Sequence, residues 1–148
     1  MTVFINAYIQ EKGKYPMSFD IDKTVDYWVE MAEYDFETGK NLLASKKFPY
    51  ALFFAHLAIE KVLKGIVVKN TREHAPYTHS LVLLAKNSGI DFNDQMLDQL
   101  AEYMEFHIEA RYPDEKKDFY KKCSEEFTTT KIDEMDKVYK WLKKKLNK

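Results

Sequence analysis

The sequence contains little of what usually builds disulfides, tight turns or membrane spans. Cys123 is the only cysteine, which excludes an intrachain disulfide and a thiolate metal cluster. Only four glycines and four prolines interrupt the chain, and this scarcity favours long helices. No apolar run reaches about 18 residues, so no membrane-spanning helix is expected. The formal net charge of −1 does not require nucleic acid, and any basic surface must be local.

What the chain does have is enough apolar material for one packed domain. Its 148 residues are 45% hydrophobic and 15% aromatic, which suits a single core and leaves no room for two full domains. The opening stretch "MTVFINAYIQEKGK" lacks a cationic start and is broken by polar residues, so we expect no signal peptide and a cytoplasmic protein. We divide the chain into an N-terminal extension, residues 1–21, and a helical domain, residues 22–148.

Apolar residues recur every three or four positions through most of residues 22–148, which is the pattern of amphipathic helices. No strand pattern competes with it, so the expected fold is all-α, an up-and-down bundle of about five helices. The expected helices run from Asp22 or Thr24 to about Ser45, from Pro49 to Asn70, over residues 80–89, from Asn93 to Pro113, and from a Thr130 cap to the C-terminus. A loop or helical turn is expected between Pro113 and about Phe127.

Charge predicts which helices are neighbours. Residues 22–45 hold six acidic residues and two lysines, and residues 131–148 hold seven lysines and three acidic residues. The resulting charges of −4 and +4 favour first and last helices that lie side by side. The aromatic residues Trp28, Phe53, Phe54 and Trp141 exceed the obvious needs of a small core, so some of them are expected at a homodimer interface.

The second helix carries one polar line, made of His56, Glu60 and Lys64 at four-residue spacing with Lys61 beside it. Two interpretations stay open. Lys61 and Lys64 can contact the phosphate of a bound nucleotide, or Glu60 and Lys64 can form an ion pair on a solvated helix edge.

Arg111 and His107 are the foremost candidates for a catalytic pair, because His107 lies four positions, or one turn, before Arg111 on one expected helix. Histidine can move a proton near neutral pH, and arginine can stabilise a phosphate that gains charge. Alternatively, Arg111 has a structural role. Its positive charge stabilises the C-terminal end of the helix, or it pairs with an acid such as Asp35. Arg72 and His79 form a weaker pair in the loop "REHAPYTH", where the favoured role of His79 is to cap or anchor the third helix. We see no third ligand that would make a metal site there.

The segments "YWVEMAEYDFETGKNLL", "FPYALFFAHLAIEKVLKGIVV", "THSL" and "EARYPD" occur in this order between about residues 25 and 145. Together they resemble the HEPN domain (higher eukaryotes and prokaryotes nucleotide-binding). The resemblance implies an up-and-down helical bundle that is often dimeric. It also implies a small prokaryotic type that is frequently paired with a minimal nucleotidyltransferase, in the manner of a toxin and its antitoxin.

Many members of that family cleave RNA with an arginine that is followed, after four to six residues, by a histidine. Here the positions after Arg111 hold Lys116, Lys117 and Asp118, so the nuclease signature is broken. We therefore expect a nucleotide- or RNA-associated binding partner, with Lys61, Lys64 and Arg111 as ligand contacts and neither a cofactor nor a metal.

Two alternatives remain open for the activity. One is a metal-independent ribonuclease toxin that uses Arg111 with His107, or Arg72 with His79. The other is an interaction module that has no catalytic role.

Overall fold

The computed structural model describes residues 19–147, and these form six α-helices and one 3-10 helix with no strand among them. The all-α prediction is therefore confirmed for the described part of the chain. Most of the predicted N-terminal extension, residues 1–18, lies outside it, as does residue 148. Within residues 19–147, no helix combines the length and apolar character that a membrane crossing needs.

The first described helix, α2 (Ile21–Ala44), begins slightly earlier than predicted. Its N-cap is Asp20, whose carboxylate accepts a hydrogen bond from the Lys23 backbone N–H at 3.0 Å. The buried face of α2 contains an acidic residue among its apolar ones: Trp28, Ala32, Asp35, Phe36 and Gly39. At Gly39 a Cβ would stand 3.1 Å from the Ala51 carbonyl oxygen of the next helix, so glycine permits this close approach.

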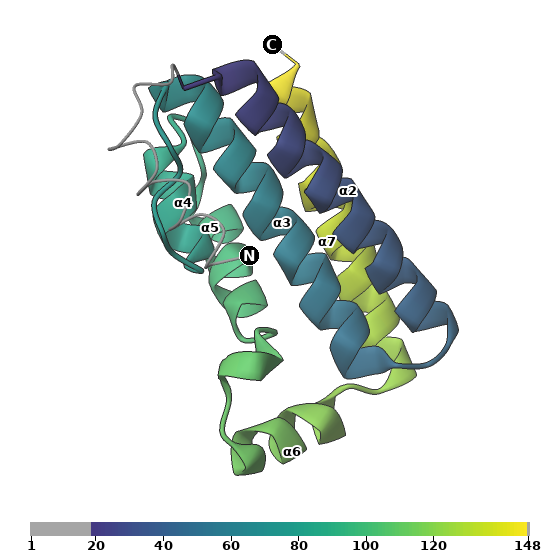
Figure 1. The fold of residues 1–148 in the computed structure, drawn as a ribbon. Helices are drawn as coiled ribbons and strands as arrows, with labels where there is room; N and C mark the ends of the chain where they lie inside the picture. Colours follow the sequence, from purple (N-terminus) through teal and green to yellow (C-terminus); the bar gives the residue numbers. More distant parts are fainter. Residues whose placement is uncertain (1–18, 148) are drawn as a thin grey trace.

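The central helix is α3 (Phe48–Thr71), as its nearly continuous apolar sequence indicated. Pro49 lies in its first turn, where the missing N–H is not needed. α2 runs antiparallel to α3 along its length, and α7 (Glu125–Leu146) packs on another side of α3 (Figure 1). Trp28 and Phe53, two of the aromatic residues predicted at a dimer interface, are buried inside this chain.

The short helices α4 (Leu81–Asn87) and α5 (Asp94–Met104) cover α3 on the side away from α2 (Figure 1). Both begin where the sequence indicated, because Ser80 caps α4 and Asn93 caps α5 through side-chain oxygens. Gly89, just beyond α4, has a φ of 77°, which fits the predicted glycine at a helix C-terminus.

The predicted fourth helix is too long: α5 ends at Met104, and a separate 3-10 turn, η1 (Ile108–Ala110), precedes Pro113. Phe106 and Ile108 are both buried. Residues two apart on an α-helix face nearly opposite directions, so both can enter the core only if the helix ends before them.

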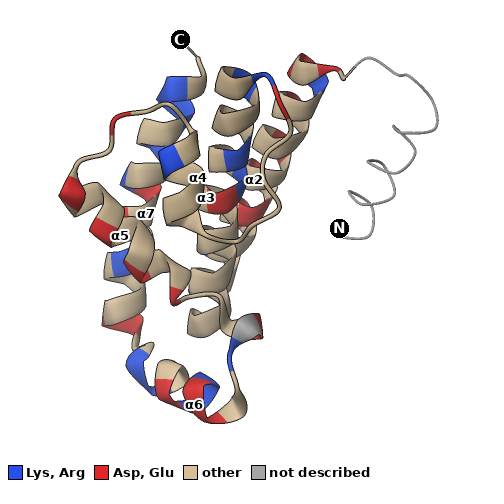
Figure 2. Cartoon of the chain, turned by 90° about the vertical axis from the view of Figure 1, so that its left-hand side faces the viewer, with Lys and Arg blue, Asp and Glu red and all other residues tan. Residues whose placement is uncertain are grey.

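Two further boundaries were wrong. Pro113 does not end a long α-helix but begins a short one, α6 (Pro113–Lys122), within the stretch where a loop or helical turn was expected, because proline suits the first helical turn. The last helix starts at Glu125, five residues before the predicted Thr130 cap. Ser124 caps it by accepting a hydrogen bond from the Phe127 N–H at 3.1 Å. α6 lies at one end of the bundle, and acidic and basic positions alternate along it (Figure 2).

The first and last long helices do meet through opposite charges, as predicted. Lys143 of α7 pairs with Glu33 of α2 at 2.5 Å, and Lys40 of α2 pairs with Asp136 of α7 at 3.6 Å. These pairs are partly exposed, so they orient the two helices more than they stabilise them.

Candidate functional site

The polar line of α3 lies at the centre of the site. The Glu60 carboxylate has only 4% of its side-chain surface exposed. One oxygen accepts from the Lys64 ammonium at 3.2 Å, and the other lies 3.1 Å from Nδ1 of His79, which comes from the loop before α4. The Glu60–Lys64 pair is therefore confirmed, but the solvated helix edge is not, because both residues are buried.

Three of the four histidines gather beside Glu60. The His107 ring lies between the other two, with its centroid 5.1 Å from that of His56 and 5.0 Å from that of His79. The three come from different places: His56 from α3, His79 from the loop after it, and His107 from the turn between α5 and η1. We call His56, Glu60, Lys64, His79 and His107 the histidine cluster.

Two ring nitrogens in the histidine cluster are buried and find no hydrogen-bond partner among the described residues. They are Nε2 of His56 and Nδ1 of His107. Nδ1 of His56 lies 3.1 Å from the Phe53 carbonyl oxygen, so it carries the proton and donates, and Nε2 keeps its lone pair. A buried polar atom without a partner reduces stability, so its presence calls for a reason other than packing.

Burial also keeps the inner rings uncharged. Burial lowers the pKa of His56 to about 4 and also lowers the pKa of His107. The neighbouring His79 lowers the pKa of His107 further. At neutral pH the inner part of the histidine cluster therefore presents lone pairs and N–H groups, not imidazolium cations.

The lysines predicted to contact a ligand already have acidic partners in the structure. Lys64 pairs with Glu60 and also lies over the Trp28 ring, 5.2 Å from its centroid. Lys61 donates to Asp35 at 2.5 Å in a pair that is buried on both sides. Burial raises the pKa of Asp35 even though Lys61 opposes it, so desolvation offsets much of the attraction in this pair.

Arg111 lies in a different environment from the histidine cluster. Its Nε donates to the Glu105 carbonyl oxygen at 2.8 Å, and its Nη2 donates to the same oxygen. The guanidinium carbon is 5.3 Å from the Phe119 ring centroid. The suggested partner Asp35 is bound to Lys61 instead. Since α5 ends at Met104, Arg111 and His107 do not share a helix face, and His107 faces the other histidines.

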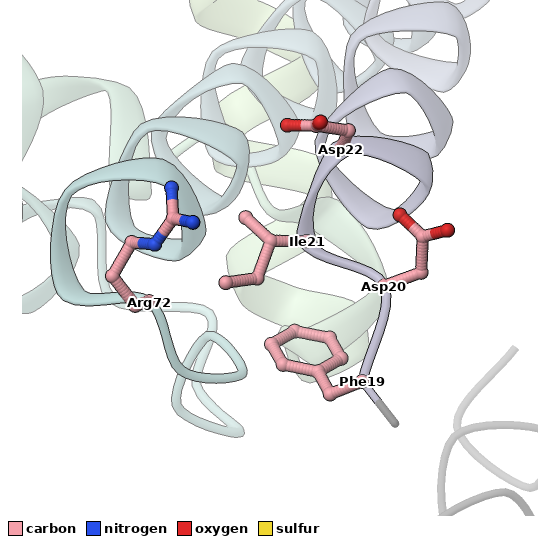
Figure 3. A pocket seen from close by; sticks show the side chains of 5 residues that line it. All are labelled: Phe19, Asp20, Ile21, Asp22 and Arg72. Carbon is pink, nitrogen blue, oxygen red and sulfur yellow. The ribbon is translucent and has the colours of Figure 1, made fainter. Parts of the chain in front are cut away.

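Arg72 and His79 also point to different neighbours. Arg72 ends α3 in a left-handed conformation and lines an open hollow of about 300 Å³ with the first residues of α2 (Figure 3). The other residues of that hollow are Phe19, Asp20, Ile21 and Asp22. His79 instead binds Glu60 and does not cap α4, a role that Ser80 fills.

The sequence did not indicate that the three histidines meet, because His79 lies 23 positions after His56 and His107 lies 28 positions after His79. The pairing of Asp35 with Lys61 had a readable signal, since Asp35 falls on the apolar stripe of α2. Among residues 19–147, no group of three or more histidine, cysteine or acidic side chains is arranged to hold a metal ion.

The arrangement defines an all-helical bundle with a polar cluster buried against its central helix. The HEPN domain family model matches residues 25–146, most of the chain. The chain therefore belongs to the HEPN domain family, as the sequence resemblance indicated.

One solved structure, TT1696 from Thermus thermophilus, is similar with a TM-score of 0.68 and 19% sequence identity. The alignment covers 82% of this chain and 97% of that one. At this identity the likeness supports the fold alone. No curated protein sequence matches the chain.

Proposed function

We propose that this HEPN-domain protein binds a nucleotide or RNA at the histidine cluster and acts as a binding partner more than as an enzyme. The observation that carries the proposal is the meeting of three imidazoles from three elements around one buried carboxylate. A fold that retains unpaired buried nitrogens at such a point gives up stability for a role that apolar side chains could not perform. The exposed His79 connects these groups with solvent.

The chain has only four histidines, which allows a direct test. Two-dimensional nuclear magnetic resonance of the imidazole nitrogens should resolve all four during titration with a short single-stranded RNA or with a mononucleotide. We expect the signals of His79 and His107 to move, while His74 outside the histidine cluster serves as an internal control. Saturable binding that moves His74 alone would place the ligand elsewhere.

Two parts of the proposal concern assembly and follow from the family. We propose a homodimer and a minimal nucleotidyltransferase as protein partner, as in a toxin–antitoxin pair. Sedimentation at tens of micromolar should give twice the mass of one chain, and a monomer there would reject the dimer. Co-expression with the cognate nucleotidyltransferase should give one complex on size exclusion, and separate elution would reject the pairing.

A metal-independent ribonuclease is the second candidate, favoured by one observation. A carboxylate-bound histidine, His79, lies beside a second histidine, His107, which is a pattern used for proton transfer. We still expect no strong cleavage, because Arg111 is bound to a backbone carbonyl and Lys64 to Glu60. Labelled RNA should stay intact when it is incubated with the protein in the presence of a metal chelator. Cleavage that is lost in both His79→Ala and His107→Ala would promote this candidate.

A further inference from the structure

The loop over residues 72–80 joins α3 to α4 and presents two rings to solvent beside the histidine cluster. Tyr77 is 63% exposed, and the His79 side chain is 57% exposed. Their ring centroids lie 6.5 Å apart with an interplanar angle of 57°. Behind His79, the His107 ring stands edge-on to it at 86°. One face of the loop is therefore built from heteroaromatic and phenolic rings.

Hydrogen bonds hold this part of the loop in place. His79 is bound to Glu60 of α3. The Thr78 hydroxyl accepts from the Ser80 N–H at 3.0 Å, and the Ser80 hydroxyl accepts from the Leu83 N–H at 3.1 Å. The His79 ring is thus attached to α3, and the backbone that follows it is attached to the start of α4. Rings that are ordered before a ligand arrives lose little conformational entropy when they bind it.

The charges within the histidine cluster, behind Tyr77 and His79, favour recognition of an uncharged group. Lys64 neutralises Glu60, and the next lysine along α3, Lys61, is bound to Asp35. His56 and His107 are uncharged at neutral pH because burial lowers both pKa values. A phosphate would therefore meet few available cations within the histidine cluster. The ring faces of Tyr77 and His79 remain accessible.

We infer that the loop over residues 72–80 is a stacking platform on which Tyr77 and His79 take one unpaired nucleobase of single-stranded RNA. The inference rests on the proposed function and names the part of the nucleic acid that is recognised. Every nucleobase offers a π face, and unpaired RNA bases commonly stack on aromatic side chains of proteins. The platform therefore accepts any base and requires that the base be unpaired.

The test compares two strands of equal length and charge. One is a fluorescently labelled oligoadenylate RNA, and the other has the same sugar–phosphate backbone without bases. Fluorescence anisotropy gives their affinities for the wild-type protein, for Tyr77→Leu, for Tyr77→Phe and for Tyr34→Leu. Tyr34 of α2 is 69% exposed and is the matched control. Because Tyr77 is exposed, its replacements should fold normally, which thermal unfolding verifies.

We expect the wild-type protein to prefer the strand with bases. Tyr77→Leu should weaken that binding about ten- to hundredfold, the range found when a stacking side chain is removed. Tyr77→Phe and Tyr34→Leu should stay within about twofold of the wild type.

Equal affinity of the wild-type protein for both strands would overturn the platform and leave RNA binding intact. So would a Tyr77→Leu variant that binds like the wild type. Failure to bind either strand would overturn the proposed function along with the platform.

Discussion

The histidine cluster and the turn around Arg111 both place polar groups against aromatic rings, and they satisfy those groups in opposite ways. In the Arg111 turn, the cation gives two N–H donors to one backbone carbonyl and covers the Phe119 ring. In the histidine cluster, two buried ring nitrogens find no partner among the described residues. The Arg111 turn satisfies its polar groups and stabilises the turn between α5 and α6. The histidine cluster leaves polar groups unsatisfied beside the exposed His79.

This difference is the basis on which we propose a structural role for the Arg111 turn and a functional role for the histidine cluster. A guanidinium that binds a main-chain oxygen six residues back in the sequence fixes the path of the chain through η1. The unpaired ring nitrogens of His56 and His107 do not fix the path of the chain, and they reduce stability. We therefore assign a structural role to Arg111, the arginine of the family pattern, and we propose that function lies with histidines that the pattern does not name.

The largest effect is expected where a buried charge next to the histidine cluster loses its partner. Asp35→Ala would leave the Lys61 ammonium buried and unpaired, so we expect a loss of about 3–5 kcal/mol in the free energy of unfolding. The double variant Asp35→Leu with Lys61→Met should recover most of it, because apolar side chains of similar size replace both charges. Urea unfolding measures each. A double variant as unstable as the single one would show that the pair does more than neutralise charge.

Acid should weaken the fold through His56. Its folded pKa of about 4 lies below the ordinary 6.5, so only the unfolded chain binds a proton between these values. Stability is therefore complete above pH 6.5 and falls as the pH drops toward 4, by about 3 kcal/mol in all. In urea unfolding between pH 7 and 4.5, His56→Phe should show a shallower decline than the wild type. Parallel curves would contradict the assignment.

Arg111→Ala should cost about 1–3 kcal/mol, because it removes both donors to the Glu105 carbonyl and the contact with Phe119. Arg111→Lys should restore only part of this, since an ammonium lacks the two-pronged geometry of the guanidinium. Thermal unfolding gives the ranking, with Lys117→Ala on the exposed side of α6 as control. If Arg111→Ala has the same melting temperature as the wild type, the stability of the turn does not depend on the arginine.

The smallest effect is expected between α2 and α7. Lys143→Ala removes an ion pair with Glu33 that is partly exposed, so its cost should be about 0–1 kcal/mol and should shrink in 1 M salt. Unfolding in low and high salt measures it. A cost above about 2 kcal/mol that persists in high salt would mean that this contact contributes through packing.

Local patterns predicted the helices better than their ends. The long periodic segments gave α2, α3 and the C-terminal part of α7, and the Ser80 and Asn93 regions gave the starts of α4 and α5. The break after Met104 was missed because it depends on burying Phe106 and Ile108 together, which is a tertiary requirement. Pro113 is ambiguous in the sequence, because proline disfavours a helix through the residue before it and also suits the first turn of a new helix.

The candidate site was predictable in its members and not in its geometry. His56, Glu60 and Lys64 were visible as a helical line, and His79 and His107 were each noted as reactive residues. The sequence pairs His79 with Arg72 and His107 with Arg111 because they are near each other along the chain. The fold instead brings the histidines together from three elements. Only the packing of η1 and of the loop over residues 72–80 against α3 creates that arrangement.

The most direct test compares His79→Ala with Arg111→Ala in two measurements on the same samples, affinity for single-stranded RNA and thermal unfolding. The account predicts that His79→Ala weakens RNA binding about tenfold or more, which corresponds to about 1.4 kcal/mol, while Arg111→Ala binds RNA like the wild type and unfolds at lower temperature. RNA binding that depends on Arg111 and not on His79 would contradict the division of roles between the two regions.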